Sequence, residues 1–175
     1  RWKPGARAGY SGQVNWYLLG EIVRRVDGRP VERYVAEEIL APLDMGGCFM
    51  ALDAAAYDTW RPRLGVMQQT SAGRTVALEA HEIDRCIRCS PGASMHGPAR
   101  ELGRFYEMML AGGHRLAAHG ASARVLREET VAAMVARQRR GMRDETFKRV
   151  VDWGLGFILN DEPKPATPAG TAPAL

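Results

Sequence analysis

Tyr10 is the residue of this sequence that is best placed to do chemistry. It follows a loop rich in glycine and proline, and Ser11 and Gly12 come directly after it, where an amphipathic helix begins. Junctions of this kind hold reactive side chains on rigid elements, so functional residues concentrate there. A phenol keeps its proton at neutral pH unless nearby cations stabilise the anion, so a tyrosine base needs charged partners. The alternative is a structural tyrosine beside the start of a helix.

Three cysteines, Cys48, Cys86 and Cys89, are the other side chains with reactive potential. Their odd number argues against a disulfide framework. Cys86 and Cys89 form one C-x-x-C pair, whereas a zinc site takes about four ligands at close spacing. We therefore expect reduced structural thiols, with metal or redox use as the alternative. We predict neither a metal site nor a cofactor.

The composition is that of an ordinary globular protein, with 46% hydrophobic and 25% charged residues. The formal net charge is only +4, and the densest basic run, residues 137–149, is interrupted by Asp144 and Glu145. We interpret this run as a solvated surface rather than a phosphate-binding patch, and we predict no nucleic-acid partner.

No apolar run of about 18 residues occurs, so no membrane span is expected. The sequence starts at Arg1 rather than methionine, so we expect the N-terminus to be missing, and the compartment and oligomeric state stay open.

An amphipathic helix is predicted to hold the tyrosine in place. From Gln13 to Asp27, apolar residues recur every three or four positions, which indicates one apolar stripe that packs inward. Ser11 is the expected N-cap, and Gly28 is expected to end the helix. Gly20 costs about 1 kcal/mol relative to alanine inside a helix, which indicates close packing against a neighbour.

Further elements are predicted from start and stop signals. Helices are expected from Pro30 to Pro42, from Asp53 to Trp60, from Pro98 to Gly112, and after Leu126. Strands are expected at residues 63–67 and 75–78 as a hairpin, and at residues 153–159 as a single edge or emerging strand.

The end of the sequence changes abruptly in composition. Residues 161–175 are rich in proline, alanine and threonine and have almost nothing to bury, so we expect a disordered tail. Residues 1–160 are then predicted to form one domain. Its predicted fold class is mostly α, with a few short strands.

Five segments of the sequence share their order and residue types with a known family. They are Pro4-Gly5 with Tyr10-Ser11-Gly12 and Leu18-Leu19-Gly20, Gly28-Arg29-Pro30 with Pro42-Leu43, Pro91-Gly92 with Leu102 and Phe105, Leu126 to Met134, and Trp153-Gly154-Leu155-Gly156. Together they resemble the superfamily of serine β-lactamases, penicillin-binding proteins and family VIII esterases. Each segment alone is weakly specific, whereas five in the family's order are fairly specific.

The resemblance implies that these residues form the helical subdomain of an α+β fold. It also implies acyl transfer, in which a serine of a Ser-x-x-Lys motif attacks the carbonyl of a small-molecule ester or amide. Tyr10 matches the catalytic tyrosine of the family's second motif. Gly12 matches a substrate-binding position where asparagine is usual, which weakens a β-lactamase or peptidase interpretation more than an esterase one.

Two motifs of the superfamily have no match in this sequence. No serine is followed three positions later by lysine, and neither Lys-Thr-Gly nor His-x-Gly occurs. We therefore expect the chain to be a truncated part of a serine hydrolase that is inactive alone. The alternative is a non-catalytic helical binding or scaffold module derived from that superfamily.

Overall fold

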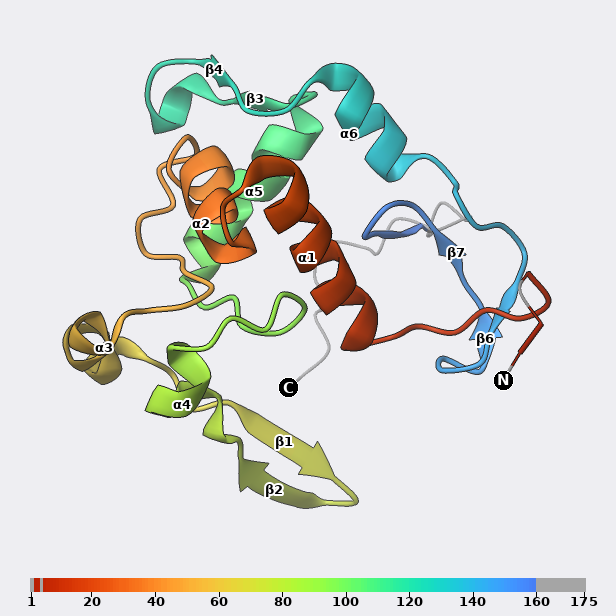
Figure 1. Cartoon of the computed structure of the whole chain (residues 1–175), viewed down its shortest axis with the longest axis horizontal. Helices are drawn as coiled ribbons and strands as arrows, with labels where there is room; N and C mark the ends of the chain where they lie inside the picture. The colour runs from red at the N-terminus through yellow and green to blue at the C-terminus, as the bar shows by residue number, and fades with distance from the viewer. Residues whose placement is uncertain (1, 4, 160–175) are drawn as a thin grey trace, which may run out of the picture. The chain divides into compact units, whose positions relative to one another are not determined.

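The computed structural model describes residues 2–3 and 5–159, which divide into two compact units. The larger unit is Ser11–Glu128, and the smaller one combines the residues up to Tyr10 with those from Glu129 onward. Helices make up most of the regular structure and the strands are short (Figure 1), which confirms the predicted fold class. The predicted domain boundary at residue 160 and the predicted tail, residues 161–175, lie outside the described residues.

The first helix, α1 (Val14–Asp27), begins later than predicted and ends where predicted. Its N-cap residue is Gln13 and no side chain caps its first turn, so the prediction of Ser11 as the cap is wrong. Ser11 lies two residues before the cap position, too early for its hydroxyl to accept the second or third helical N–H. At the other end, Gly28 has a φ of 92° and its N–H donates to the Arg24 carbonyl oxygen at 2.9 Å. This left-handed conformation is the common glycine ending of a helix.

Most of the predicted apolar stripe of α1 is exposed, although Val23 is half-buried. Ile22 and Val26 on this stripe are 55% and 84% exposed. The helix packs instead through the buried Gly20. A Cβ on Gly20 would lie 3.1 Å from Pro91 Cγ and 3.3 Å from Val31 Cγ1, so its missing side chain allows the predicted close packing.

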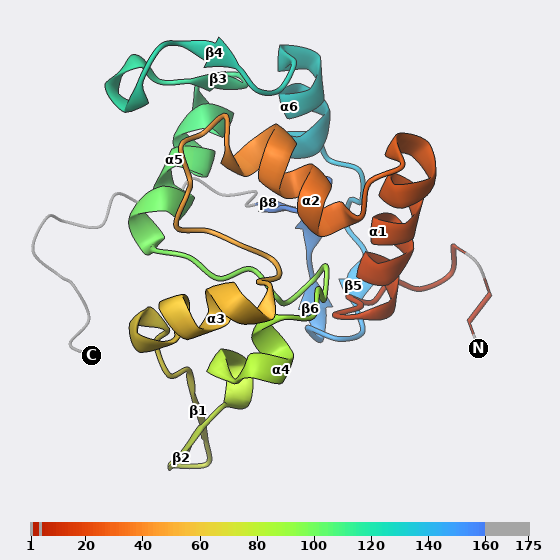
Figure 2. The ribbon, with the colours of Figure 1, turned by 60° about the vertical axis from the view of Figure 1, so that its left-hand side comes forward.

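The rest of the larger unit consists of short elements. α2 (Val31–Val35) has Pro30 at its N-cap and passes directly into a π-helical turn, Ala36–Leu40. α1 and α2 lie side by side, as their short connection predicts (Figures 1 and 2). The further elements are α3 (Ala54–Trp60), β1 (Gln68–Ser71), β2 (Arg74–Ala77), α4 (Ile83–Cys86), α5 (Ala99–Leu110), β3 (His114–Arg115) and β4 (Ala123–Arg124). No helix in the described part of the chain is long and apolar enough to cross a membrane.

The hairpin of β1 and β2 is formed, with Ser71 opposite Arg74 in an antiparallel pair. Ala72 and Gly73 between them have φ values of 50° and 76°, the geometry that suits a two-residue hairpin turn. Its first strand starts at residue 68 rather than at the predicted residue 63, because Arg61–Arg63 forms a 3₁₀ turn around its proline.

The buried side of α5 includes Met109 but is not its most apolar side. Glu101 and Met108 point into the interior, whereas Leu102 and Leu110 are 47% and 89% exposed. The glutamate occupies this position because its carboxylate accepts the N–H of Gly47 at 2.8 Å. The buried side of α5 thus includes a carboxylate that hydrophobicity alone does not select.

The smaller unit contains short strands: β5 (Arg143–Asp144), β6 (Arg149–Val150), β7 (Asp152–Trp153) and β8 (Ile158–Leu159). α6 (Glu128–Val135) leads into it from the larger unit. β5 pairs with β6 and β7 with β8, both antiparallel. The prediction of a single strand at residues 153–159 is therefore wrong, because Gly156, with a φ of 87°, turns the chain back on itself. Ala8 forms a parallel bridge with Asp144, which joins the N-terminal segment to β5.

Candidate functional site

Tyr10 lies in an aromatic cluster of the smaller unit. Its ring stacks on Trp153, with ring centroids 5.5 Å apart and an angle of 9° between the planes. It also packs at a tilt against Phe147, again with centroids 5.5 Å apart. Such contacts fix the plane of an aromatic ring. Tyr10 nevertheless remains 38% exposed, so the ring is held by its neighbours and open to solvent.

The main chain of Tyr10 is fixed on both sides of its Cα. Its N–H donates to Asp144 Oδ1 at 3.2 Å, and its carbonyl oxygen accepts the Thr146 hydroxyl at 2.9 Å. Next to it, the N–H of Glu145 donates to the Ala8 carbonyl oxygen at 2.9 Å. The position of Tyr10 therefore depends on the turn that joins β5 to β6.

The carboxylate of Asp144 is completely buried, and both of its oxygens accept hydrogen bonds. Its Oδ1 also accepts the backbone N–H groups of Thr146 at 2.9 Å and Phe147 at 3.1 Å. Its Oδ2 accepts Arg139 Nη2 at 2.8 Å. Burial raises the pKa of this carboxyl group, but Arg139 and the backbone N–H groups outweigh burial and lower the pKa from 3.8 to about 2. Asp144 is therefore ionised at neutral pH.

Arg139 connects this buried carboxylate to the aromatic cluster. Its guanidinium lies over the Trp153 ring, 5.6 Å from the centroid. The two residues also exchange backbone hydrogen bonds of 3.0 and 3.1 Å. The basic run that was predicted to be a solvated surface thus contributes to the interior, because Arg139 pairs with Asp144 and Arg137 pairs with the buried Asp152.

Gly12, the second predicted site residue, belongs to the larger unit, where it is exposed in the bend before α1. Sequence reasoning missed Asp144 and Arg139, which complete the surroundings of Tyr10. One local signal was present, because an aspartate is typical of a turn in which its carboxylate accepts the backbone N–H two residues on. That signal indicates the turn, and only the fold shows that the same carboxylate binds Tyr10.

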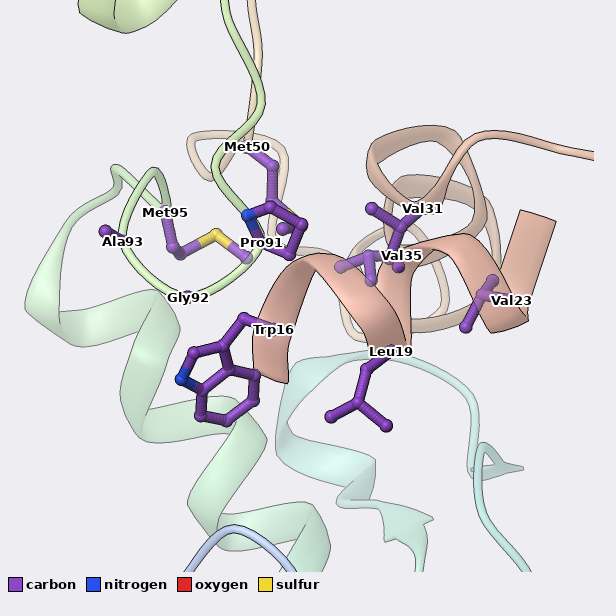
Figure 3. Close-up of a pocket in the computed structure, with 11 residues that line it drawn as sticks. Trp16, Leu19, Val23, Val31, Val35, Met50, Pro91, Gly92, Ala93 and Met95 are labelled. Carbon is purple, nitrogen blue, oxygen red and sulfur yellow. The ribbon is translucent and has the colours of Figure 1, made fainter. Parts of the chain in front are cut away.

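The larger unit holds an apolar cavity of about 530 Å³ between α1, α2 and the loop before α5 (Figure 3). Its lining includes Trp16, Leu19, Val31, Met50, Pro91 and Met95. Trp16 lies so close to Gly92 that any Cβ at that position would collide with the indole. None of the described side chains that line the cavity is ionisable, so they can receive an apolar group but cannot transfer protons.

The three cysteines are free, and their surroundings do not favour a thiolate. Burial raises the pKa of each thiol, and the carboxylate of Glu101 adds to this effect at Cys48, whose pKa rises to about 11. Thiols that keep their proton are poor nucleophiles and poor metal ligands. Among the residues that the structure describes, no group of three or more His, Cys, Asp or Glu side chains could hold a metal ion.

Solved structures with a similar fold include two homologues of penicillin-binding proteins and a hydrolase. The chain superposes on a penicillin-binding protein homolog from Caulobacter crescentus with a TM-score of 0.65 and 25% identity. It superposes on the octameric penicillin-binding protein homologue from Pyrococcus abyssi with a TM-score of 0.64 and 21% identity. The third is EstCE1, a hydrolase with promiscuous acyltransferase activity, with a TM-score of 0.65 and 18% identity. A comparison with curated protein sequences gave no match.

These superpositions cover 91%, 90% and 92% of this chain, but only 44%, 31% and 42% of the respective neighbours. The chain thus spans less than half the length of each of them.

A family model named Beta-lactamase matches residues 1–172, nearly the entire sequence. The resemblance carried by the five ordered segments is confirmed by this match. The chain therefore belongs to the beta-lactamase family.

Proposed function

We propose that this chain is part of a serine hydrolase whose full-length parent hydrolyses small-molecule esters or amides through a seryl acyl-enzyme. In this proposal Tyr10 is the catalytic tyrosine, and Gly12 lies at the substrate-binding position of the same segment. The observation that carries the proposal is the way Tyr10 is held. Two main-chain hydrogen bonds and two aromatic neighbours fix it, and yet 38% of the residue stays exposed.

Family membership and the structural neighbours support hydrolysis of a small molecule. The Beta-lactamase family model covers residues 1–172. The similarity to EstCE1, which has acyltransferase activity, supports acyl transfer. Gly12 supports an ester rather than a β-lactam or peptide substrate, because glycine offers no side-chain amide to bind a substrate amide.

The chemistry that this proposal assigns to Tyr10 is proton transfer. In this step the phenol oxygen of Tyr10 accepts the proton of the attacking serine as the serine oxygen bonds to the carbonyl carbon. A proton passes from Tyr10 to the leaving group, and the bond between that group and the carbonyl carbon breaks. A positioned base of this kind contributes a rate factor of about 10²–10⁴. Because no Ser-x-x-Lys occurs in these 175 residues, we propose that the chain alone does not catalyse acyl transfer.

The isolated chain is tested with a chromogenic ester, a chromogenic cephalosporin and a fluorophosphonate probe that labels activated serines. We expect no turnover above the buffer rate and no labelled serine. Turnover accompanied by a covalent serine adduct, located by mass spectrometry, would overturn the proposed inactivity.

The reading frame upstream of Arg1 separates the hydrolase from a non-catalytic scaffold module. We expect an in-frame Ser-x-x-Lys, whereas a genuine start codon near Arg1 would favour the scaffold. In the full-length product, Tyr10→Phe should lower kcat by a factor of about 10²–10⁴ because the proton acceptor is lost. Tyr106→Phe is the matched control, since it removes the hydroxyl of a tyrosine on α5 that is 50% exposed. It should leave kcat unchanged, and an unchanged kcat in Tyr10→Phe would contradict the catalytic assignment.

A further inference from the structure

One carboxylate is linked to all three residues of the aromatic cluster. Asp144 Oδ1 accepts the main-chain N–H groups of Tyr10 and Phe147, which carry two of the rings. Asp144 Oδ2 accepts Arg139 Nη2, and the guanidinium of Arg139 lies over the third ring, that of Trp153. A side chain with no exposed surface therefore contacts each member of the cluster, either directly or through one arginine.

Arg139 depends on this carboxylate for its place over Trp153. Its Nη2 also donates to the Val151 carbonyl oxygen, but at the longer distance of 3.2 Å. Its Nε is buried and has no hydrogen-bond partner among the described residues. Removing Asp144 takes away the closest hydrogen-bond acceptor of the Arg139 guanidinium. The guanidinium should then move, because an unpaired charge that is largely shielded from water is costly.

We propose that Asp144 is a positioning residue for Tyr10: together with Arg139 it fixes both the main chain and the ring plane, so that the phenol is presented in one orientation. The inference deepens the proposed function of Tyr10 and rests on it. Asp144 itself has no exposed surface and therefore acts on the reaction through Tyr10 rather than on the substrate.

Asp152 offers a matched control for a role that is merely structural. It is also buried, at 5% exposure, and it also belongs to the smaller unit. It too combines a backbone N–H, that of Gly141 at 2.7 Å, with an arginine, Arg137 at 3.0 Å. Neither of these partners belongs to the aromatic cluster. Asp152 directly precedes Trp153 in β7, so Asp152→Asn disturbs the fold next to the cluster. It leaves the hydrogen bonds of Asp144 to Tyr10 and Arg139 in place, and it should therefore change the orientation of Tyr10 less than Asp144→Asn does.

The first test measures the orientation of Tyr10 in the 175-residue chain. 3-Fluorotyrosine is incorporated at position 10 and followed by ¹⁹F NMR in the wild type, Asp144→Asn and Asp152→Asn. We expect one sharp resonance in the wild type and in Asp152→Asn, and a shifted or multiple resonance in Asp144→Asn. A resonance in Asp144→Asn identical to that of the wild type would overturn the proposal. If Asp144→Asn does not fold, Arg139→Lys is measured instead, because it keeps the charge but removes the planar fork, and the same two outcomes apply.

The second test measures kinetics in the full-length hydrolase. Asp144→Asn should lower kcat about tenfold or more and leave KM unchanged, because misplacing a catalytic group affects the reacting geometry. In a Tyr10→Phe background the same substitution should have no further effect on kcat. An equal loss in both backgrounds would show that Asp144 acts without Tyr10 and would overturn the proposal.

The two tests also separate this inference from the function on which it rests. A full-length protein without hydrolase activity contradicts the proposed function, and the NMR result then still decides whether Asp144 orients Tyr10. An active enzyme whose Tyr10 resonance is the same in the wild type and in Asp144→Asn contradicts the positioning role alone.

Discussion

Asp144 is removed from water on folding and nevertheless ionises more readily than a free aspartate. Its pKa in the folded protein is about 2, below the ordinary value of 3.8, so folding stabilises the ionised carboxylate relative to the protonated one. This difference corresponds to about 2 kcal/mol of stability. Because the folded pKa is depressed, the contribution is fully present above about pH 4 and is lost as the pH falls through about 2.

Asp144→Asn should therefore lower the free energy of unfolding by about 2 kcal/mol at pH 7, since the ionised form is no longer available to Arg139. The gap between variant and wild type should narrow as the pH approaches 2, where the wild-type carboxylate also becomes protonated. Urea unfolding across this pH range measures both values. A gap that is the same at pH 7 and at the acid end would contradict the assignment of the stability to this ionisation.

Tyr10 and Asp144 differ in how far the sequence reveals them. Tyr10 could be selected from the sequence because the residues around it form a recognisable segment. Its contact with Asp144 could not, because the two residues are 134 positions apart and no local pattern reports such a pairing. Whether Tyr10 and Gly12 are functional remains a prediction.

Helices were predicted well in their extent and less well in the face that they bury. α1 and α5 both end within about two residues of the prediction, since glycine and proline signals are local. The side that each helix buries differs from its most apolar side. Burial depends on which other elements pack against the helix, whereas the spacing of apolar residues describes only the helix itself. Gly20 on α1 and Glu101 on α5 show this, since both point inward at positions that a hydrophobic pattern does not select.

Two glycines inside helices should respond oppositely to alanine. Gly103→Ala on α5 should stabilise the protein by up to about 1 kcal/mol, because alanine is the better helix former. Apart from the helix backbone and the two adjacent residues, no atom of the described residues lies within 4 Å of the new Cβ. Gly20→Ala on α1 gains the same propensity but brings its Cβ to 3.1 Å from Pro91 and 3.3 Å from Val31. It should destabilise the protein, because this close packing must open. Thermal unfolding of both variants measures the difference, and equal shifts would contradict it.

Two leucines provide a similar comparison for side-chain burial. Leu43→Ala should cost about 2–5 kcal/mol, because the side chain is fully buried and its removal leaves a cavity. Leu18→Ala on α1 should cost less than about 0.5 kcal/mol, because that leucine is already 58% exposed. Chemical denaturation of the two variants tests the assignment, and a large loss in Leu18→Ala would show that the α1 stripe is covered in solution.

At the scale of the whole molecule, the exposed apolar side chains of α1 should dominate how the chain behaves in solution. Val14, Leu18, Ile22 and Val26 recur every four residues along one side of this helix, and each is more than half exposed. A contiguous apolar surface of this kind binds hydrophobic dyes and promotes association.

The double substitution Leu18→Glu with Ile22→Glu should therefore reduce the fluorescence of bound ANS while the melting temperature stays close to that of the wild type. Leu110→Glu is the control, since it changes an apolar residue that is 89% exposed at the end of α5. It should change ANS binding little. A fall in melting temperature for the double variant alone would contradict the exposure of this face.

The pairing of the N-terminal segment with β5 also determines when the candidate site can form during synthesis. Tyr10 is synthesised 134 residues before the aspartate that accepts its N–H. At about 5–20 residues per second, this delay lasts roughly 7–27 s. The larger unit is continuous, Ser11–Glu128, and is complete in sequence before Asp144 has been made. A nascent chain that stops short of Asp144 therefore lacks the groups that hold Tyr10, so this arrangement forms only in translation products that extend past β5.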